Sequence, residues 1–227
     1  MRDSMAVDAL DWTQGDGSVH DRLTLADWRR RMAALYAEVR SMAASDPVIG
    51  LAHWRSVREW LFREHPQSPL RAAERPAFRS KHFDHDPALR FVAPVEPAPA
   101  DDPGALGVQL PNSGADTMSF RRIGTVRLPF PDGEQRLSVF WMAGYAGGLF
   151  IPFRDATNGR ETYGAGRYLV DAAKSHDLGT DEATGDLVLD FNFATQPSCA
   201  FDPRWACPLA PLENKLGIEV RAGERLT

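Results

Sequence analysis

Cysteine and lysine are both rare in this sequence of 227 residues. The two cysteines lie in one proline-bounded segment, residues 197–208, so a disulfide-rich secreted domain, which needs many cysteines, is excluded. Lysine occurs only at positions 81, 174 and 215, and the densest cationic run is the arginine triplet at 29–31, which is typical of a solvated helix face. With a net charge of −5 and no basic block, the chain lacks a footprint for phosphate backbones, and no nucleic acid is expected as a partner.

Long apolar runs are also missing. No stretch approaches the roughly 18 residues that a helix needs to cross a bilayer, so no membrane partner is expected. The N-terminal residues lack the cationic region, apolar stretch and small-residue cleavage site of a secretory signal. We therefore expect a cytoplasmic protein, a compartment in which thiols are commoner than disulfides. Hydrophobic residues still make up 43% of the chain, which is enough for a sizeable core.

The first part of the chain has the period of helices. After an aperiodic, flexible tail at residues 1–22, Thr24-Leu-Ala-Asp27 resembles a capping box, and apolar residues then recur at steps of three and four. Asp46-Pro47 predicts a second helix that ends before His65. Together the two segments predict a helical hairpin over about 24–64. Its aromatic-rich stripe needs a surface to pack against, and a sheet is the obvious candidate.

From about residue 88 the apolar period drops to two. Pro131-Asp132-Gly133 and Asn158-Gly159 each separate two alternating runs, and each predicts a β-hairpin. Consecutive hairpins form an antiparallel meander, which tends to curl when it is large. We therefore predict an α+β fold in a single domain, residues 23–227: an N-terminal helical hairpin packed on a curved antiparallel β-meander or half-open barrel over about 88–227. The expected strands cover residues 88–95, 120–128, 135–142, 149–154, 162–170, 187–193 and 216–221.

Polar side chains gather around the second turn. Glu161, Tyr163 and Arg167 share odd-numbered positions, so a strand over 162–170 would place them on one face, where they line a pocket or form a buried ion pair. A structural ion pair and a ligand site fit this pattern equally well. Turn chemistry accounts for the polar residues at 155–159 without any further function.

A second polar set surrounds the strand expected over 187–193. Apolar residues alternate there with Asp190 and Asn192, which therefore lie on the opposite face. That face is an ordinary solvated surface, or it turns inward and meets the polar set of the second hairpin. Glu213 and Asn214 precede the last strand, where they join the same sheet end or anchor the loop through hydrogen bonds to the backbone.

Several roles are open for Cys199 and Cys207. Seven residues separate them, whereas paired ligands of structural zinc are usually closer, and His82 and His85 would have to complete the set. A nucleophile needs a neighbouring base, and no histidine lies close in sequence. A disulfide is sterically possible across the loop. We expect two buried thiols in a structural role, packing the proline-rich loop against the sheet, and no metal.

The C-terminal half carries several short strings in a fixed order. They are FRDAT at 153–157, ETYGAGRYL at 161–169, DFN at 190–192, the cysteine pair, EN at 213–214 and RAGE at 221–224. In this order they resemble the domain-of-unknown-function 1684 family of uncharacterised bacterial proteins, and the resemblance extends back to Phe83 and Ser68-Pro69-Leu70. It implies a single-domain bacterial protein with no assigned reaction. The sequence departs from the family pattern at 194–199, where Tyr-Asn is expected before the proline and a second proline before the cysteine, so no role of that Tyr or Asn carries over.

The function that these patterns favour is binding of a small polar or anionic molecule at one end of the sheet. The ligand-binding candidates are Glu161, Tyr163, Arg167, Asp190, Asn192, Glu213 and Asn214. One alternative is an enzyme, a hydrolase or isomerase with Asp190 or Glu161 as general base. Another is an interaction module that uses the aromatic-rich helices. No cofactor is predicted, because Gly164 and Gly166 lie inside an expected strand, not in a turn between a strand and a helix.

Overall fold

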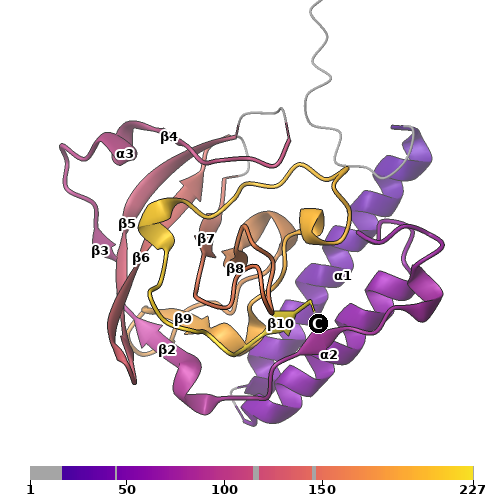
Figure 1. Cartoon of the computed structure of the whole chain (residues 1–227), viewed down its shortest axis with the longest axis horizontal. Helices are drawn as coiled ribbons and strands as arrows, with labels where there is room; N and C mark the ends of the chain where they lie inside the picture. Colours follow the sequence, from indigo (N-terminus) through magenta and orange to yellow (C-terminus); the bar gives the residue numbers. More distant parts are fainter. Residues whose placement is uncertain (1–16, 44, 115–117, 145–146, 227) are drawn as a thin grey trace, which may run out of the picture.

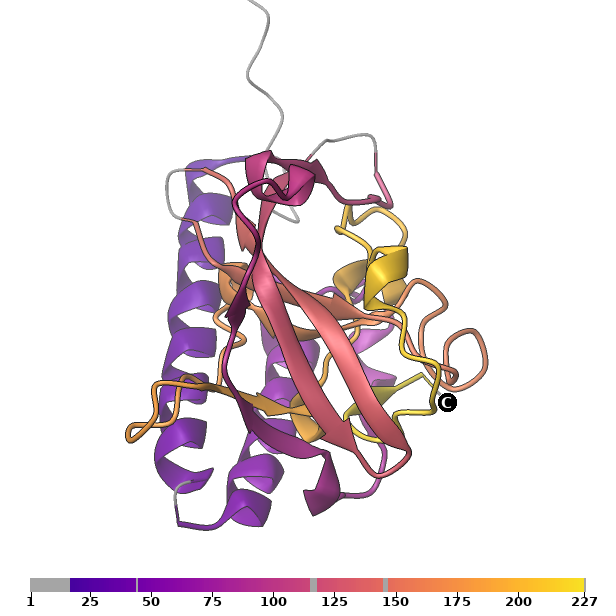
Figure 2. The ribbon, with the colours of Figure 1, turned by 90° about the vertical axis from the view of Figure 1, so that its left-hand side faces the viewer.

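A helical hairpin lies on one side of the molecule and the main β-sheet on the other (Figures 1 and 2). The computed structural model describes residues 17–43, 45–114, 118–144 and 147–226, so the first 16 residues of the predicted tail lie outside the described residues. Helix α1 spans Val19–Ala43 and packs along α2, which spans Pro47–Glu64. None of the described helices is long and apolar enough to cross a membrane.

The two helices differ in how well their starts could be predicted. Helix α2 begins where expected, because Asp46 accepts hydrogen bonds from two backbone N–H groups of the first turn and Pro47 occupies the first helical position. Helix α1 begins earlier than the predicted start at Thr24, which lies inside the helix and donates to the carbonyl of Asp21. Ser18 supplies the cap, since its Oγ accepts from the backbone N of Asp21 at 3.2 Å. Ser18 and Asp21 have the same spacing as Thr24 and Asp27 and lie six residues earlier in the chain.

Six antiparallel strands form the main sheet in the order β3-β5-β6-β7-β8, with β4 also paired to β5. The predicted turn at Pro131-Asp132 joins β5 and β6, and the second predicted hairpin is β7 with β8. Gly124 lies at a bulge in β5 and allows β3 to cross closely, because a Cβ there would lie 2.3 Å from the carbonyl oxygen of Glu96. The strands are β3 Glu96–Pro97, β4 Val108–Gln109, β5 Ser119–Phe130, β6 Gly133–Met142, β7 Leu149–Phe153 and β8 Arg167–Asp171.

Two further pairs of strands lie outside this sheet, so the described residues form three sheets and no closed barrel. Strand β2, Arg90–Ala93, was expected in the meander but pairs with β9, Leu187–Asp190. Strand β1, Lys81–His82, pairs with β10, Glu224–Arg225. The predicted strand over 216–221 is wrong. Leu216 and Ile218 form single hydrogen bonds to the backbone of the loop after β7, and the carbonyl of Val220 accepts from the side chain of Arg167.

The short helix η4, Phe191–Phe193, joins the helical layer to the sheet. Asp190 ends the predicted strand over 187–193 early by capping η4, with its Oδ1 accepting from the backbone N of Asn192 at 2.9 Å. The turn places Phe191 in the core of the sheet and Phe193 in the core of the helical hairpin. The other short helices are η1 Arg75–Ala77, η2 Pro87–Leu89, α3 Pro103–Leu106, η3 Ala172–Lys174, η5 Ser198–Ala200 and η6 Leu212–Asn214.

Candidate functional site

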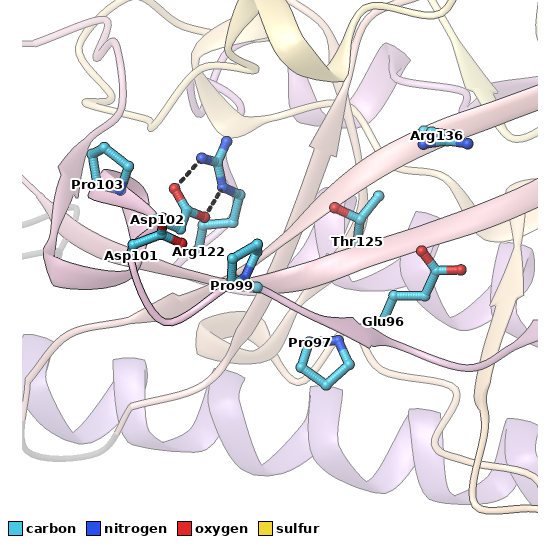
Figure 3. A pocket seen from close by; sticks show the side chains of 10 residues that line it. Glu96, Pro97, Pro99, Asp101, Asp102, Pro103, Arg122, Thr125 and Arg136 are labelled. Atoms are coloured by element: carbon cyan, nitrogen blue, oxygen red, sulfur yellow. Dashed lines mark hydrogen bonds and ion pairs between the residues drawn. The ribbon is translucent and has the colours of Figure 1, made fainter.

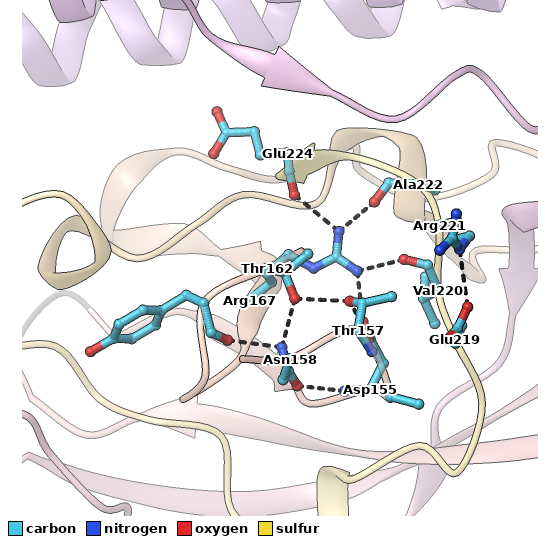
Figure 4. Close-up of polar contacts among 12 residues, drawn as sticks. Asp155, Thr157, Asn158, Thr162, Arg167, Glu219, Val220, Arg221, Ala222 and Glu224 are labelled. Atoms are coloured by element: carbon cyan, nitrogen blue, oxygen red, sulfur yellow. Dashed lines mark hydrogen bonds and ion pairs between the residues drawn. The ribbon is translucent and has the colours of Figure 1, made fainter. Parts of the chain in front are cut away.

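Arg167 lies at the centre of a buried polar network (Figure 4). Its side chain is 0% exposed, and its Nη2 donates to Asp155 Oδ2 at 2.6 Å and to the carbonyl of Val220 at 2.7 Å. Its Nη1 donates to the carbonyls of Ala222 and Glu224. Burial lowers the pKa of Arg167, while the Asp155 carboxylate opposes that shift. The guanidinium thus connects the loop after β7 to the C-terminal segment, and both of its terminal nitrogens are used.

The turn that precedes Arg167 is held together by its own side chains. Asn158 donates through Nδ2 to Thr162 Oγ1 at 2.8 Å and to the carbonyl of Tyr163 at 2.9 Å. Its Oδ1 accepts from the backbone N of Asp155 at 2.7 Å. Gly166, with φ of +105°, lies so close to the chain that a Cβ would be 2.4 Å from the carbonyl oxygen of Phe153. These contacts agree with turn chemistry and close backbone contact as the reason for the polar and glycine residues.

The predicted shared face of Glu161, Tyr163 and Arg167 is not formed. Residues 161–166 lie outside β8, which starts at Arg167, so strand alternation does not apply to them. Glu161 reaches the surface and pairs with Arg221 Nη2 at 2.6 Å. Tyr163 places its hydroxyl beside Cys199. Only Arg167 points into the buried network.

Asp190 and Asn192 belong to a different network. Asn192 Nδ2 donates to Asp190 Oδ1 at 2.8 Å and to the carbonyl of Asp86 at 2.8 Å, and its Oδ1 accepts from the backbone N of Asp86 at 2.9 Å. Burial raises the pKa of Asp190. The pair therefore fixes the turn before β2 to the end of β9. Among the described residues, the side-chain partner of Asp190 is Asn192, that of Glu161 is Arg221 and that of Arg167 is Asp155, so the expected meeting of the two polar sets is not observed.

Asn214 bridges two strands at a point where their own pairing stops. Its Nδ2 donates to the carbonyls of Ser138 in β6 at 3.0 Å and Pro152 in β7 at 2.7 Å, and its Oδ1 accepts from the backbone N of Ser138 at 2.7 Å. The neighbouring Glu213 points outward and accepts from Arg122 Nη1 at 3.0 Å. Of these two predicted residues, Asn214 anchors backbone and Glu213 contacts the wall of a cleft.

That cleft lies between the segment from β3 to α3 and the strands β5 and β6 (Figure 3). It has a volume of about 560 Å³, within the range of small-molecule sites. In Figure 3 the pair of Arg122 and Asp102 lies toward one end and Arg136 toward the other, with Thr125 and Glu96 between them. The lining residues are Glu96, Pro97, Ala98, Pro99, Asp101, Asp102, Pro103, Arg122, Thr125 and Arg136.

The two arginines of the cleft differ in how firmly they are held. Arg122 forms a two-pronged ion pair with Asp102, with Nε at 2.7 Å from Oδ2, and this contact holds the pKa of Asp102 below its usual value. The side chain of Arg136 is 58% exposed. Among the ion pairs of the described residues it takes part in one, with the carboxylate of Glu134 at 3.2 Å, which is also exposed. Neither arginine was among the predicted site residues, because the proline- and glycine-rich residues 96–116, which form the facing wall, are typical of a plain surface loop. The acids of that loop and the arginines of the next strands were the available signal.

A second buried ion pair was also missed. Arg58 of α2 donates through Nε and Nη2 to both carboxylate oxygens of Glu224 in β10. Glu224 Oε2 also accepts from the backbone N of Gln196 at 2.8 Å. The pair connects the last strand to the helical hairpin. A charge on the buried face of a helix was the signal in the sequence.

The cysteine loop is attached at several points. Cys199 and Cys207 are free and buried thiols. The backbone N of Cys207 donates to Ser113 Oγ at 2.8 Å, and Trp205 Nε1 donates to the carbonyl of Pro69 at 3.1 Å. His82, which was weighed as a zinc ligand with the cysteines, packs edge-on against Trp54 instead. These contacts agree with a loop that is clamped to its surroundings.

Comparisons of the sequence and of the fold with known proteins find similarities to a family and to a solved structure. The family model described as "Protein of unknown function (DUF1684)" matches residues 78–225. A solution NMR structure of an uncharacterised protein from Haloarcula marismortui is 32% identical, with a TM-score of 0.57 over 82% of this chain and 97% of that one. No match was found among curated proteins. The family model and this relative thus agree on sequence and fold similarity, and neither description assigns an activity.

Proposed function

We propose that this chain, which belongs to the DUF1684 family of proteins of unknown function, binds a small polar or anionic molecule. The proposed site is the cleft of about 560 Å³ beside β5 and β6. The observation that carries the proposal is Arg136, an arginine on the wall of this cleft whose ion pair is weak.

The walls of the cleft are rigid, which favours binding. Pro97, Pro99 and Pro103 restrict one wall, and the close crossing at Gly124 fixes β3 against β5. The pair of Arg122 and Asp102 fixes the far end. A preformed cleft saves the ordering cost that a ligand would otherwise have to overcome.

The lining of the cleft carries three carboxylates and two arginines, so we place the anionic group of the ligand at Arg136, the end away from Asp101 and Asp102. Arg127 and Arg136 lie directly opposite each other on β5 and β6, so their positive charges reinforce one another. The ion pairs of Arg127 with Glu96 at 2.7 Å and of Arg136 with Glu134 at 3.2 Å are both solvent-exposed and therefore weak, and the second is the longer of the two. A carboxylate or phosphate can displace Glu134 and bind the guanidinium in a two-pronged manner. The hydroxyl of Thr125 and the carboxylate of Asp101 would contact polar groups on the rest of the molecule.

The test is a titration of the full chain with inorganic phosphate and with small mono- and dicarboxylates. We expect saturable binding by calorimetry and a rise in Tm that depends on ligand concentration. Arg136→Gln should weaken the affinity at least about tenfold, which is the loss of a charge-assisted contact worth roughly 1.5–3 kcal/mol. Arg30→Gln, an exposed arginine on α1, is the matched control and should leave the affinity unchanged.

Two results would contradict the proposal. One is the absence of saturable binding for every anion tested. The other is an equal loss of affinity in Arg136→Gln and Arg30→Gln, which would show that binding depends on net charge alone.

A further inference from the structure

Cys199 and Cys207 lie at the two ends of a loop and are in contact with each other. The backbone N of Cys199 donates to Cys207 Sγ at 3.4 Å, so the two residues are in contact. Both thiols are free. A disulfide needs two cysteines whose side chains approach one another, and the contact between Cys199 in η5 and Cys207 in the following loop brings this pair together.

The surroundings of Cys199 favour its thiolate. The thiol of Cys207 and the hydroxyls of Ser113 and Tyr163 lie near its sulfur, and the ammonium of Lys174 in η3 adds a favourable charge. Together these groups lower the pKa of Cys199 to about 6 against the opposing effect of burial. Burial raises the pKa of Tyr163 to about 12 and that of Tyr168 in β8 well above its ordinary value, so both phenols stay protonated at neutral pH.

Cys207 has the complementary properties. The hydrogen bond that it donates to Cys199 raises its pKa, and burial acts in the same direction, so Cys207 remains a thiol. Its side chain is almost fully buried at 2% exposure, while Cys199 keeps 7%. A small oxidant therefore reaches Cys199 first. An activated thiolate beside a protonated partner thiol is the arrangement of an attacking and a resolving cysteine.

We propose that Cys199 and Cys207 form a peroxide-reactive dithiol, in which Cys199 attacks a small hydroperoxide and Cys207 resolves the product to an intrachain disulfide. In the first step the sulfur of Cys199 bonds to one oxygen of hydrogen peroxide, and the O–O bond breaks. The departing hydroxide takes a proton from solvent and leaves as water, which gives a sulfenic acid on Cys199.

In the second step the sulfur of Cys207 attacks the sulfenic sulfur. The S–O bond breaks, the proton of the Cys207 thiol leaves with the hydroxide as a second water, and the disulfide forms. Two thiols have lost two electrons and the peroxide has been reduced to two waters, so the sequence balances. Two equivalents of a low-molecular-weight thiol restore the reduced pair by exchange.

The experiment treats the full, folded chain with hydrogen peroxide and blocks the remaining thiols before denaturation. We expect the number of free thiols per chain to fall from two to none, with the chain still monomeric on a non-reducing gel. Trypsin cleaves after Arg204, so the disulfide joins the peptide 175–204 to the peptide 205–215, which mass spectrometry identifies. The rate should rise with pH through a midpoint below the pKa of an ordinary thiol, because the surroundings of Cys199 favour its thiolate.

Variants separate the two roles. Cys207→Ser should stop at a sulfenic acid on Cys199 that dimedone traps, and Cys199→Ser should abolish the reaction. The folded wild type should also react faster than the chain in urea, because the activation depends on the fold. Disulfides between chains, a midpoint at the pH of an ordinary thiol, or equal rates in the folded and unfolded chain would each overturn the proposal, and these wild-type measurements do not depend on the variants folding.

Discussion

At the scale of single residues, buried charges and rings hold loops in place. Arg167 uses both terminal nitrogens of its guanidinium for one carboxylate and three carbonyls, a set that only a planar fork with many donors can satisfy. His176 shows the opposite case of a ring kept neutral. It stacks on Tyr36 with centroids 5.1 Å apart, and its Nδ1 lies 3.2 Å from Thr195 Oγ1. Burial lowers the pKa of His176 to about 3, because the charged form loses its hydration.

This neutral ring makes stability depend on pH. The folded protein holds His176 with a pKa of about 3, and burial likewise lowers the pKa of His82 to about 4, against 6.5 for an unperturbed histidine. Between these values the unfolded chain binds more protons, so the free energy of unfolding falls as the pH falls from about 6.5 toward 4. Asp190, whose pKa is raised, acts in the opposite direction.

The measurement is urea unfolding at pH 7 and at pH 4.5 for the wild type and His176→Phe. The variant keeps the stacking on Tyr36 and removes one titrating ring, so it should lose less stability between the two pH values. Asp190 is present in both proteins and cancels in the comparison. An equal loss in both proteins would show that His176 is not the group that titrates.

At the scale of elements, the side chain of Asn214 replaces backbone hydrogen bonds between strands β6 and β7. The paired residues of β6 and β7 are only Phe140 with Phe150 and Trp141 with Leu149. Pro152 has no N–H to continue the ladder, and Asn214 supplies the missing donor and acceptor from η6. The short helix η6 therefore contributes hydrogen bonds to the sheet, although it is not a strand.

Removal of this amide should weaken the sheet locally. Asn214→Ala leaves the N–H and C=O of Ser138 without their partner, which should lower the free energy of unfolding by about 1–3 kcal/mol. Hydrogen exchange should show faster exchange at the amide of Ser138. Leu212→Ala, which changes an 81% exposed side chain of the same short helix, is the control and should have little effect. Equal effects of the two substitutions would contradict the role of the amide.

At the scale of the whole molecule, the C-terminal segment holds the layers together. Its carbonyls surround Arg167, and the carboxylate of Glu224 reaches the helical hairpin through Arg58. The chain end thus contacts both the loop after β7 and α2. Such a segment can take its place only when both layers have formed.

The buried pair of Arg58 and Glu224 gives a test of this connection. Glu224→Gln leaves Arg58 buried without its counter-charge, and the free energy of unfolding should fall by about 3–5 kcal/mol. The double variant Arg58→Met, Glu224→Met removes both charges and should cost less than the single substitution, because no unpaired charge remains. Chemical denaturation measures both values. A double variant that is less stable than Glu224→Gln would show that the ion pair is not the connection that matters.

Some features of the candidate sites followed from local patterns. The turn chemistry around Asn158 depends on short-range geometry, which the sequence carries. The cysteine loop was expected to be packed in place, but its attachment points at Ser113 and Pro69 are distant in the sequence. The cleft did not follow, because Arg136 comes from the main sheet and its opposite wall from a loop without periodicity. Proximity between such segments depends on strand pairing that no local pattern encodes.

The sequence by itself determined the helical hairpin, the cap at Asp46, the α+β class and the hairpins β5–β6 and β7–β8, since each depends on periodicity or on turn residues a few positions apart. Only the tertiary structure decided that the chain from Val220 to Glu224 supplies three carbonyls to Arg167. It also decided that β2 pairs with β9 and that Cys199 meets Cys207. Buried polar groups must form hydrogen bonds, and their partners are the groups that tertiary packing places beside them, which can be distant in the sequence.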